Sequence, residues 1–255
     1  SVTRKSPTDI YKTTRDAIVS LTIIHKNDAW VGSGFFIQYK NEKYICTVAH
    51  NVVENMRNTK VDTILASVSN INNTGNHKVV SCSVVGVAGY ADIAILKVNE
   101  DVSQQSYLDW GDSKTVVNGS TCYVLGDPRG VDAISISKGV VRDNKYIYGT
   151  IIESMCISAP IYGGNSGGPI VNALGCVIGL VSFGLDGTDT LSWGCAQCIA
   201  QTISEQIIDT QKDFIGGTIQ ADLFPVDAIY CHFLNFLSST ISCLWLFHLL
   251  IYTYL

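Results

Sequence analysis

Short apolar segments separated by turn-forming residues fill most of the chain up to residue 198. Six segments lie within residues 17–98 and six within residues 113–198, with a polar stretch between the two groups. They are rich in Val, Ile and Thr and are bounded by Gly- and Asn-containing stretches, which is the pattern of β-strands and turns. Residues 146–158 are expected to form one strand. Many short strands with Gly-rich turns are typical of barrels or sandwiches, so we predict an all-β fold with two strand groups.

The two ends of the chain differ from this pattern. Residues 1–16 are a polar amino-terminal segment, and residues 199–213 predict an amphipathic helix that closes the domain at about residue 215. The remaining tail, residues 216–255, is hydrophobic, and its part 229–255 carries no charged residue. About twenty apolar residues are enough to span a bilayer. The tail is therefore interpreted either as a carboxy-terminal membrane anchor or as a segment that packs on a partner or remains from a truncated domain.

Composition excludes some classes of partner. The formal net charge of the 255 residues is −5, and no basic run exceeds two residues. Phosphate binding requires clustered Lys and Arg, so a nucleic-acid partner is not expected. The amino-terminal residues are polar and show no secretory signal, so the sequence does not indicate a compartment. Asn72 and Asn118 match the glycosylation pattern, which matters only in a secretory lumen.

The cysteines do not predict a cofactor site. There are nine, an odd number, and they lie mostly within apolar runs, where a free Cys behaves as a small buried hydrophobe. Cys195 and Cys198 have CxxC spacing, but no second pair completes a zinc site. We therefore expect no metal and no organic cofactor.

A Gly-rich segment around Ser166 carries the first sign of chemistry. Its sequence is GGNSGGP, residues 163–169. A serine hydroxyl needs an adjacent base and donors aimed at the oxyanion that its attack creates. Flanking glycines let the backbone turn sharply and present its N–H groups. We expect Ser166 as nucleophile, with the N–H groups of Gly164 and Ser166 as the oxyanion hole.

Two further residues have the types that such a nucleophile needs. His50 ends the apolar strand that precedes it, where it can titrate near neutral pH. Asp92 leads another core strand, where a carboxylate is costly unless it is hydrogen-bonded, and fixing a histidine tautomer is one way to satisfy it. The order His, Asp, Ser is that of chymotrypsin, with two residues in the first strand group and one in the second.

With these motifs the sequence resembles the trypsin-like serine peptidases, and within them the HtrA (Deg) branch, over about residues 16–212. The segments that carry the resemblance are GSGFFI, TVAHNV, YADIAILKV, LGDPRG, ISISKGVV, GGNSGGPIVN and GLVSFG. It implies two six-stranded antiparallel β-barrels of chymotrypsin type, one near residues 17–98 and one near residues 113–198. The peptidase domain would then cover residues 17–215.

The chain also departs from the secreted members of this family. The secreted members place an Asp before the nucleophile, and this Asp pairs with a new amino terminus. The chain has Asn165 at that position, as HtrA enzymes do. Asn51 and Tyr162 stand where the secreted members carry disulfide cysteines. These departures imply that neither that ion pair nor those disulfides operate here, and the forty or so residues after the helix are too few for the usual PDZ domain.

By the same resemblance, the primary specificity pocket would involve Pro160 at its base and Ser182, Phe183 and Gly184 along its wall. Pro160 is uncharged, so the pocket favours apolar residues before the scissile bond, unless Asp186 supplies a charge. The sequence thus predicts a serine endopeptidase that acts on polypeptides. The alternatives are a non-catalytic peptide-binding module on the same fold and a membrane-attached scaffold.

Overall fold

The computed structural model describes residues 4–53, 60–69, 77–128, 133–147, 153–184 and 192–214. Its twelve strands form two closed barrels. The first barrel contains β1 (Ile18–His25), β2 (Asp28–Tyr39), β3 (Glu42–Thr47), β4 (Thr63–Ser69), β5 (His77–Ala88) and β6 (Ile93–Val98). The second contains β7 (Thr121–Gly126), β8 (Ser135–Ile147), β9 (Glu153–Ile157), β10 (Pro169–Asn172), β11 (Val177–Gly184) and β12 (Ser192–Ala196).

Both barrels are antiparallel, with strand orders β1-β2-β3-β6-β5-β4 and β10-β11-β12-β9-β8-β7. The prediction of two six-stranded barrels is confirmed. The expected single strand at residues 146–158 is wrong in detail. Its first two residues end β8, and its later part forms β9. Gly149 interrupts the run, but a single Gly inside a strand pattern also fits a bulge, so the sequence alone does not separate the two strands.

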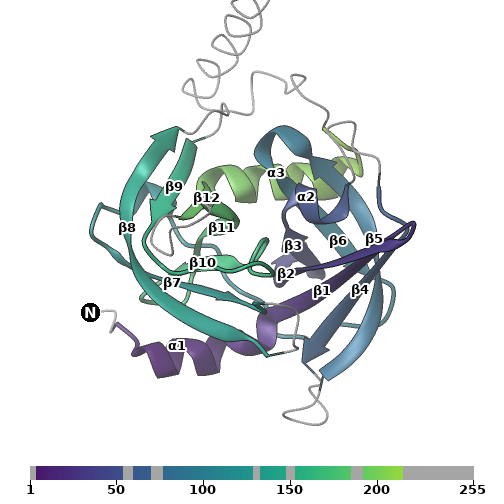
Figure 1. Ribbon diagram of the computed structural model, residues 1–255, viewed down its shortest axis with the longest axis horizontal. Helices are drawn as coiled ribbons and strands as arrows, with labels where there is room; N and C mark the ends of the chain where they lie inside the picture. Colours follow the sequence, from purple (N-terminus) through teal and green to yellow (C-terminus); the bar gives the residue numbers. More distant parts are fainter. Residues whose placement is uncertain are drawn as a thin grey trace, which may run out of the picture.

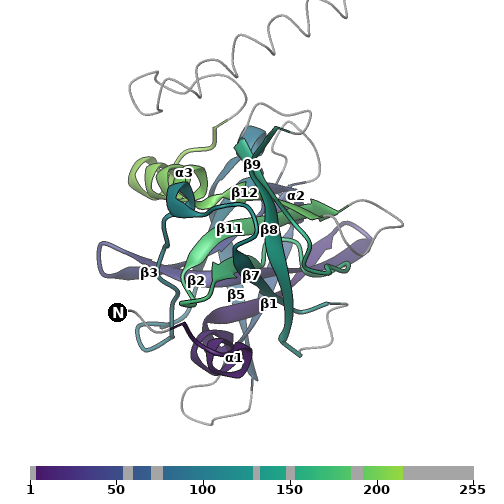
Figure 2. The same cartoon turned by 90° about the vertical axis from the view of Figure 1, so that its left-hand side faces the viewer.

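The helices lie outside the barrels. They are α1 (Pro7–Thr14), α2 (Ala49–Val52) and α3 (Gln197–Thr210), with short 3₁₀ turns η1 (Arg15–Ala17), η2 (Gly89–Ala91) and η3 (Ser113–Thr115). Figure 1 shows the first barrel on the right, the second on the left and α3 spanning the upper side of both. In Figures 1 and 2, α1 lies on the side of the molecule remote from α3.

Alternation along the strands divides the core into three clusters. Phe36 points into the interior of the first barrel, while its neighbour Phe35 points out toward the second barrel, because successive strand residues face opposite ways. The interior of the second barrel contains residues such as Met155 and Ile170. The cluster between the barrels also takes in Ile203 and Ile207 of α3. The predicted apolar face of that helix thus packs against both barrels and fixes their relative position.

No helix among the described residues is long and apolar enough to cross a membrane. Residues 229–255, for which an anchor was predicted, lie outside the described residues, as does Asn72. The last described residues return to the first barrel. The N–H of Phe214 donates to the carbonyl oxygen of Val87 at 2.7 Å, and the N–H of Val87 donates to a carboxylate oxygen of Asp213 at 3.1 Å.

Candidate active site

His50 and Asp92 meet at one end of the first barrel. β3 pairs with β6, with Thr47 opposite Ala94, so the segment after β3 lies beside the segment before β6. His50 Nδ1 is 2.8 Å from Asp92 Oδ2, and the backbone N–H of His50 donates to Asp92 Oδ1 at 2.9 Å. Both carboxylate oxygens are therefore engaged by one residue, which fixes the orientation of the carboxylate toward the imidazole.

Local backbone structure sets these positions. His50 lies in α2, a single helical turn that follows β3 directly, rather than at the strand end that the sequence predicts. Asp92 ends the turn η2 in the left-handed conformation, at φ 53° and ψ 44°. Asp tolerates this conformation better than most residues do. It directs the side chain back over α2 while the chain continues into β6.

The environment of His50 changes its acidity in two opposing ways. Removal of water around the imidazole lowers its pKa and is the largest single effect. The hydrogen bond to Asp92 and the negative charge of Asp92 together outweigh it, so the pKa of His50 lies above the ordinary 6.5. The side chain remains 48 % exposed, so its ring is accessible to solvent and to a reacting group. A histidine in this setting can accept and return a proton near neutral pH.

Ser182 donates the third hydrogen bond that Asp92 accepts, a contact that the sequence does not predict. It was expected to line the specificity pocket, but its hydroxyl donates to Asp92 Oδ2 at 2.5 Å. The contact joins β11 of the second barrel to the His50–Asp92 pair of the first. A hydroxyl donor stabilises the charged carboxylate. No pattern in the sequence marks this role, because 90 residues separate the two partners.

The Gly-rich segment forms a tight loop between β9 and β10. The N–H of Asn165 donates to the carbonyl oxygen of Tyr162 at 3.0 Å, which closes a β-turn. Gly164, the third residue of that turn, has φ +100°, as a type II turn requires. Gly164 and Asn165 are buried, whereas Tyr162 is half exposed. The loop therefore holds a defined conformation without a disulfide at Tyr162.

The carbonyl oxygen of Ser166 contacts the first barrel at two points. It accepts from Asn51 Nδ2 at 2.9 Å and from the N–H of Ser33 at 2.8 Å. Asn51 directly follows His50, so the serine lies beside the turn that carries the histidine. Among the described residues, no hydrogen bond joins the side chains of Ser166 and His50 directly. Such bonds are often long in proteins without substrate.

The other predicted pocket residues are only partly described. The carbonyl oxygen of Pro160 accepts from the Ser137 hydroxyl at 2.8 Å, which anchors the segment before the loop. Phe183 and Gly184 lie at the end of β11, paired with Trp193 and Ser192 of β12. Asp186 lies outside the described residues.

The cysteines and acidic residues form no metal site in the described part of the chain. No group of three or more His, Cys, Asp or Glu side chains there could hold a metal ion. Six described cysteines are free thiols. Burial raises the pKa of Cys46 to about 12, which keeps this thiol protonated and unreactive.

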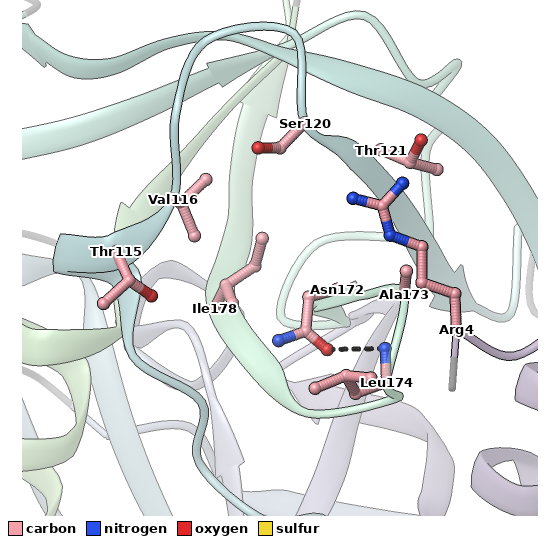
Figure 3. Close-up of a pocket in the computed structure, with 9 residues that line it drawn as sticks. All are labelled: Arg4, Thr115, Val116, Ser120, Thr121, Asn172, Ala173, Leu174 and Ile178. Carbon is pink, nitrogen blue, oxygen red and sulfur yellow. Dashed lines mark hydrogen bonds between the residues drawn. The ribbon is translucent and has the colours of Figure 1, made fainter. Parts of the chain in front are cut away.

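A pocket of about 320 Å³ lies away from these residues (Figure 3). Arg4, the start of β7 at Thr121 and the end of β10 at Asn172 contribute to its lining. In Figure 3 the side chain of Arg4 lies close to Thr121. β7 and β10 approach the Ser166 loop at their other ends, Gly126 and Pro169. This pocket is therefore separate from the candidate active site.

Comparison with known proteins agrees with this geometry. Residues 32–180 match the trypsin-like peptidase domain family. An HtrA-like serine protease of Staphylococcus epidermidis is 29% identical over 174 residues, covering 64% of this chain and 28% of the relative. The HtrA-like serine protease of Staphylococcus aureus is 31% identical over 166 residues, covering 60% of this chain and 20% of the relative. The chain thus spans little more than a quarter of these relatives at most.

Solved structures give the same fold. The HtrA-type protease AlgW with a tripeptide superposes with a TM-score of 0.69 at 21% identity, covering 81% of this chain and 64% of that one. A serine endoprotease from Yersinia pestis gives 0.66 at 20% identity, covering 81% and 68%. The family match includes more than half of the chain and contains His50, Asp92 and Ser166. The protein therefore belongs to the trypsin-like peptidase family and is similar to its HtrA-type serine proteases.

Proposed function

We propose that this protein is a serine endopeptidase that hydrolyses peptide bonds through an acyl-enzyme. The observation that carries the proposal is the hydrogen-bonded His50–Asp92 pair beside the loop that presents Ser166. A serine hydroxyl becomes a useful nucleophile only next to a base, and the base works only if its tautomer is fixed. Asp92, which accepts from Nδ1, leaves Nε2 of His50 as the proton acceptor.

The reaction then follows in two stages. Ser166 Oγ attacks the carbonyl carbon of the substrate while His50 Nε2 takes the hydroxyl proton. His50 returns that proton to the leaving amine as the peptide bond breaks and the acyl-enzyme forms. Water, deprotonated by the same nitrogen, then releases the acid product and regenerates Ser166. Asp92 orients the imidazole and stabilises the imidazolium in each stage.

Two backbone N–H groups near Ser166 are available to bind the oxyanion. The carbonyl groups of Tyr162, Gly164, Asn165 and Ser166 all accept hydrogen bonds within the protein. The N–H groups of Gly164 and Ser166, in contrast, meet no acceptor in the part of the chain that the structure describes. Unpaired donors in a buried loop are costly unless a ligand uses them. A tetrahedral intermediate with its negative oxygen here would satisfy both.

A substrate strand has a suitable partner in the last residues of β11. β11 pairs with β12 through Gly184, but β10 reaches only as far as Leu180 on the other side. An extended substrate could therefore pair with residues 182–184.

We also propose a preference for apolar residues before the scissile bond. Pro160 brings no charge, and burying a substrate Lys or Arg without a counter-ion costs several kcal/mol. Burying an aliphatic side chain gains about 1.5–3 kcal/mol. Digestion of a peptide library, read by mass spectrometry, should show cleavage mainly after Val, Ala or Leu. Dominant cleavage after Lys or Arg would contradict this and point to a charge supplied by Asp186.

Labelling with an active-site-directed fluorophosphonate tests the proposed reaction. The wild-type protein should be labelled and should cleave peptides, whereas Ser166→Ala should lose labelling and at least about 10³-fold in turnover. Ser120→Ala, on the turn before β7, is the matched control and should behave as wild type. If the wild type is neither labelled nor active, the chain is a peptide-binding module rather than an enzyme. If Ser166→Ala is labelled as well as the wild type, Ser166 is not the nucleophile.

A further inference from the structure

Two polar side chains of the first barrel hold the loop that carries Ser166. Asn51 is only 2% exposed and donates from Nδ2 to the carbonyl oxygen of Ser166 at 2.9 Å and to Thr47 Oγ1 at 3.1 Å. Ser33 is fully buried and donates from Oγ to the carbonyl oxygen of Gly164 at 2.6 Å. Its backbone N–H donates to Ser166 as well. The loop of the second barrel is thus held by donors from the first.

These donors are themselves fixed. Thr47 Oγ1, which accepts from Asn51, donates to the carbonyl oxygen of Ser33 at 2.7 Å, so the two residues belong to one network. Ser33 Oγ also accepts from the N–H of Asp127 at 2.9 Å. Each hydroxyl in this network acts as donor and acceptor at once, which leaves neither of them free to rotate.

The packing around the network leaves no room for alternatives. A Cβ atom at Gly32 would lie 2.4 Å from Asn51 Nδ2, and one at Gly167 would lie 2.2 Å from both Ser33 O and Thr47 Oγ1. A side chain at Gly32 would therefore displace the Asn51 amide, and one at Gly167 would displace the backbone of Ser33 or the Thr47 hydroxyl. The two glycines allow β2 and the loop to approach closely enough for direct hydrogen bonds.

The positions of the held carbonyl groups matter for the proposed oxyanion donors. The Gly164 carbonyl belongs to the peptide unit that directly follows the unit with the Gly164 N–H group. The Ser166 carbonyl and the Ser166 N–H group are related in the same way. Because each peptide unit is planar, holding a unit fixes the Cα atom that it shares with the adjacent unit, so the adjacent unit can turn only about the line that joins its own two Cα atoms. We infer that Ser33 and Asn51 are positioning residues that orient the oxyanion donors of Gly164 and Ser166, an inference that rests on the proposed peptidase activity.

This arrangement also links the donors to the base. Asn51 follows His50 in the one-turn helix α2, so a single turn positions both the imidazole and the loop opposite it. No new amino terminus is needed to order the loop, in agreement with Asn165 in place of an acidic residue. The side chains of Ser33 and Asn51 touch no substrate atom in this scheme and act only through the backbone of the loop.

Four single variants test the inference. Ser33→Ala and Asn51→Ala remove the donors, and Asn51→Leu removes the donor while filling the space. Ser113→Ala is the matched control, because Ser113 is also buried but its hydroxyl accepts from the backbone N–H of Cys198 in α3. Each protein is assayed with an apolar peptide substrate below its measured unfolding temperature, and its affinity for a peptide boronate, a tetrahedral adduct former, is measured.

The donor variants should lose about 10- to 100-fold in kcat, with KM changed by less than about threefold, since displaced oxyanion donors act only on the transition state. The affinity for the boronate should fall by the same factor. The acid limb of the pH profile should not move, because the His50–Asp92 pair is untouched. Ser113→Ala should lose stability but neither kcat nor boronate affinity.

Two outcomes would overturn the inference, and they are distinguishable. If Ser166→Ala is inactive but Asn51→Leu and Ser33→Ala keep wild-type kcat and boronate affinity, the peptidase assignment stands and the positioning role fails. If the wild type itself neither cleaves peptides nor reacts with a fluorophosphonate, the proposed function fails and the positioning role fails with it.

Discussion

Replacement of Asp92 by Asn removes the charge that orients His50 while keeping the shape of the side chain. The carboxylate accepts three hydrogen bonds: from the His50 N–H at Oδ1, and from His50 Nδ1 and the Ser182 hydroxyl at Oδ2. An Asn side chain offers one acceptor oxygen and one NH₂ group. The NH₂ group of the introduced Asn side chain would therefore face a group that donates a hydrogen bond to Asp92 in the wild-type protein.

The choice between the two orientations determines the size of the effect. The backbone N–H of His50 cannot become an acceptor, whereas the imidazole can move its proton from Nδ1 to Nε2. The amide oxygen should thus face the backbone, and the NH₂ group should face Nδ1. The proton on Nε2 then occupies the position that must accept the proton of Ser166. A fixed wrong tautomer lowers turnover by about 10⁴-fold, or about 5 kcal/mol.

Steady-state cleavage of an apolar peptide, together with thermal unfolding, measures this effect. Asp209→Asn is the matched control, because Asp209 forms an ion pair with Lys40 at 2.7 Å on the surface, at the carboxyl end of α3. It should keep wild-type activity. If Asp92→Asn folds and retains kcat within about tenfold of wild type, the tautomer argument is wrong.

Three further predictions concern the pH dependence, the turn at Gly164 and the carboxy-terminal tail. The pKa of His50 is raised above 6.5, and only the neutral imidazole accepts a proton. We therefore expect kcat/KM to fall as the pH drops through a value above 6.5. A flat profile between about pH 5 and 8 would contradict a histidine base. Gly164→Ala should strain the turn by about 1–2 kcal/mol because the φ of Gly164 is +100°, and the resulting shift of the loop should lower kcat. Gly163→Ala, with no atom within 4 Å of the added Cβ, should be neutral in the same kinetic assay, and equal rates for the two variants would refute the turn's role. If residues 229–255 anchor the protein, the full chain should sediment with carbonate-washed membranes. A chain ending at Gly217, which keeps the hydrogen bond between Phe214 and Val87, should stay soluble and active. A full chain that stays in the supernatant would exclude the anchor.

Local signals in the sequence account for much of the fold and for the candidate triad. Apolar alternation with turn residues predicts strands wherever one face is buried, and both barrels lie within the predicted ranges 17–98 and 113–198. The helix predicted at residues 199–213 is α3, Gln197–Thr210. His50, Asp92 and Ser166 each lie in a short motif whose residue types already indicate their chemistry. These features depend on neighbours within a few residues, which a single sequence contains in full.

Contacts between distant segments were decided only by the tertiary structure. The one-turn helix α2 is too short to have a periodic pattern, so the sequence places His50 at a strand end instead. Ser33, Asn51 and Ser182 lie in segments that resemble the family, but nothing near them in the sequence names their partners, which lie 90 to 131 residues away. Their roles exist because β2, α2 and β11 converge on one loop when the two barrels pack together. A single buried hydroxyl or amide has the same residue type whether it is idle or essential, and only its partners, which the packing of the two barrels brings within hydrogen-bond distance, distinguish the two cases.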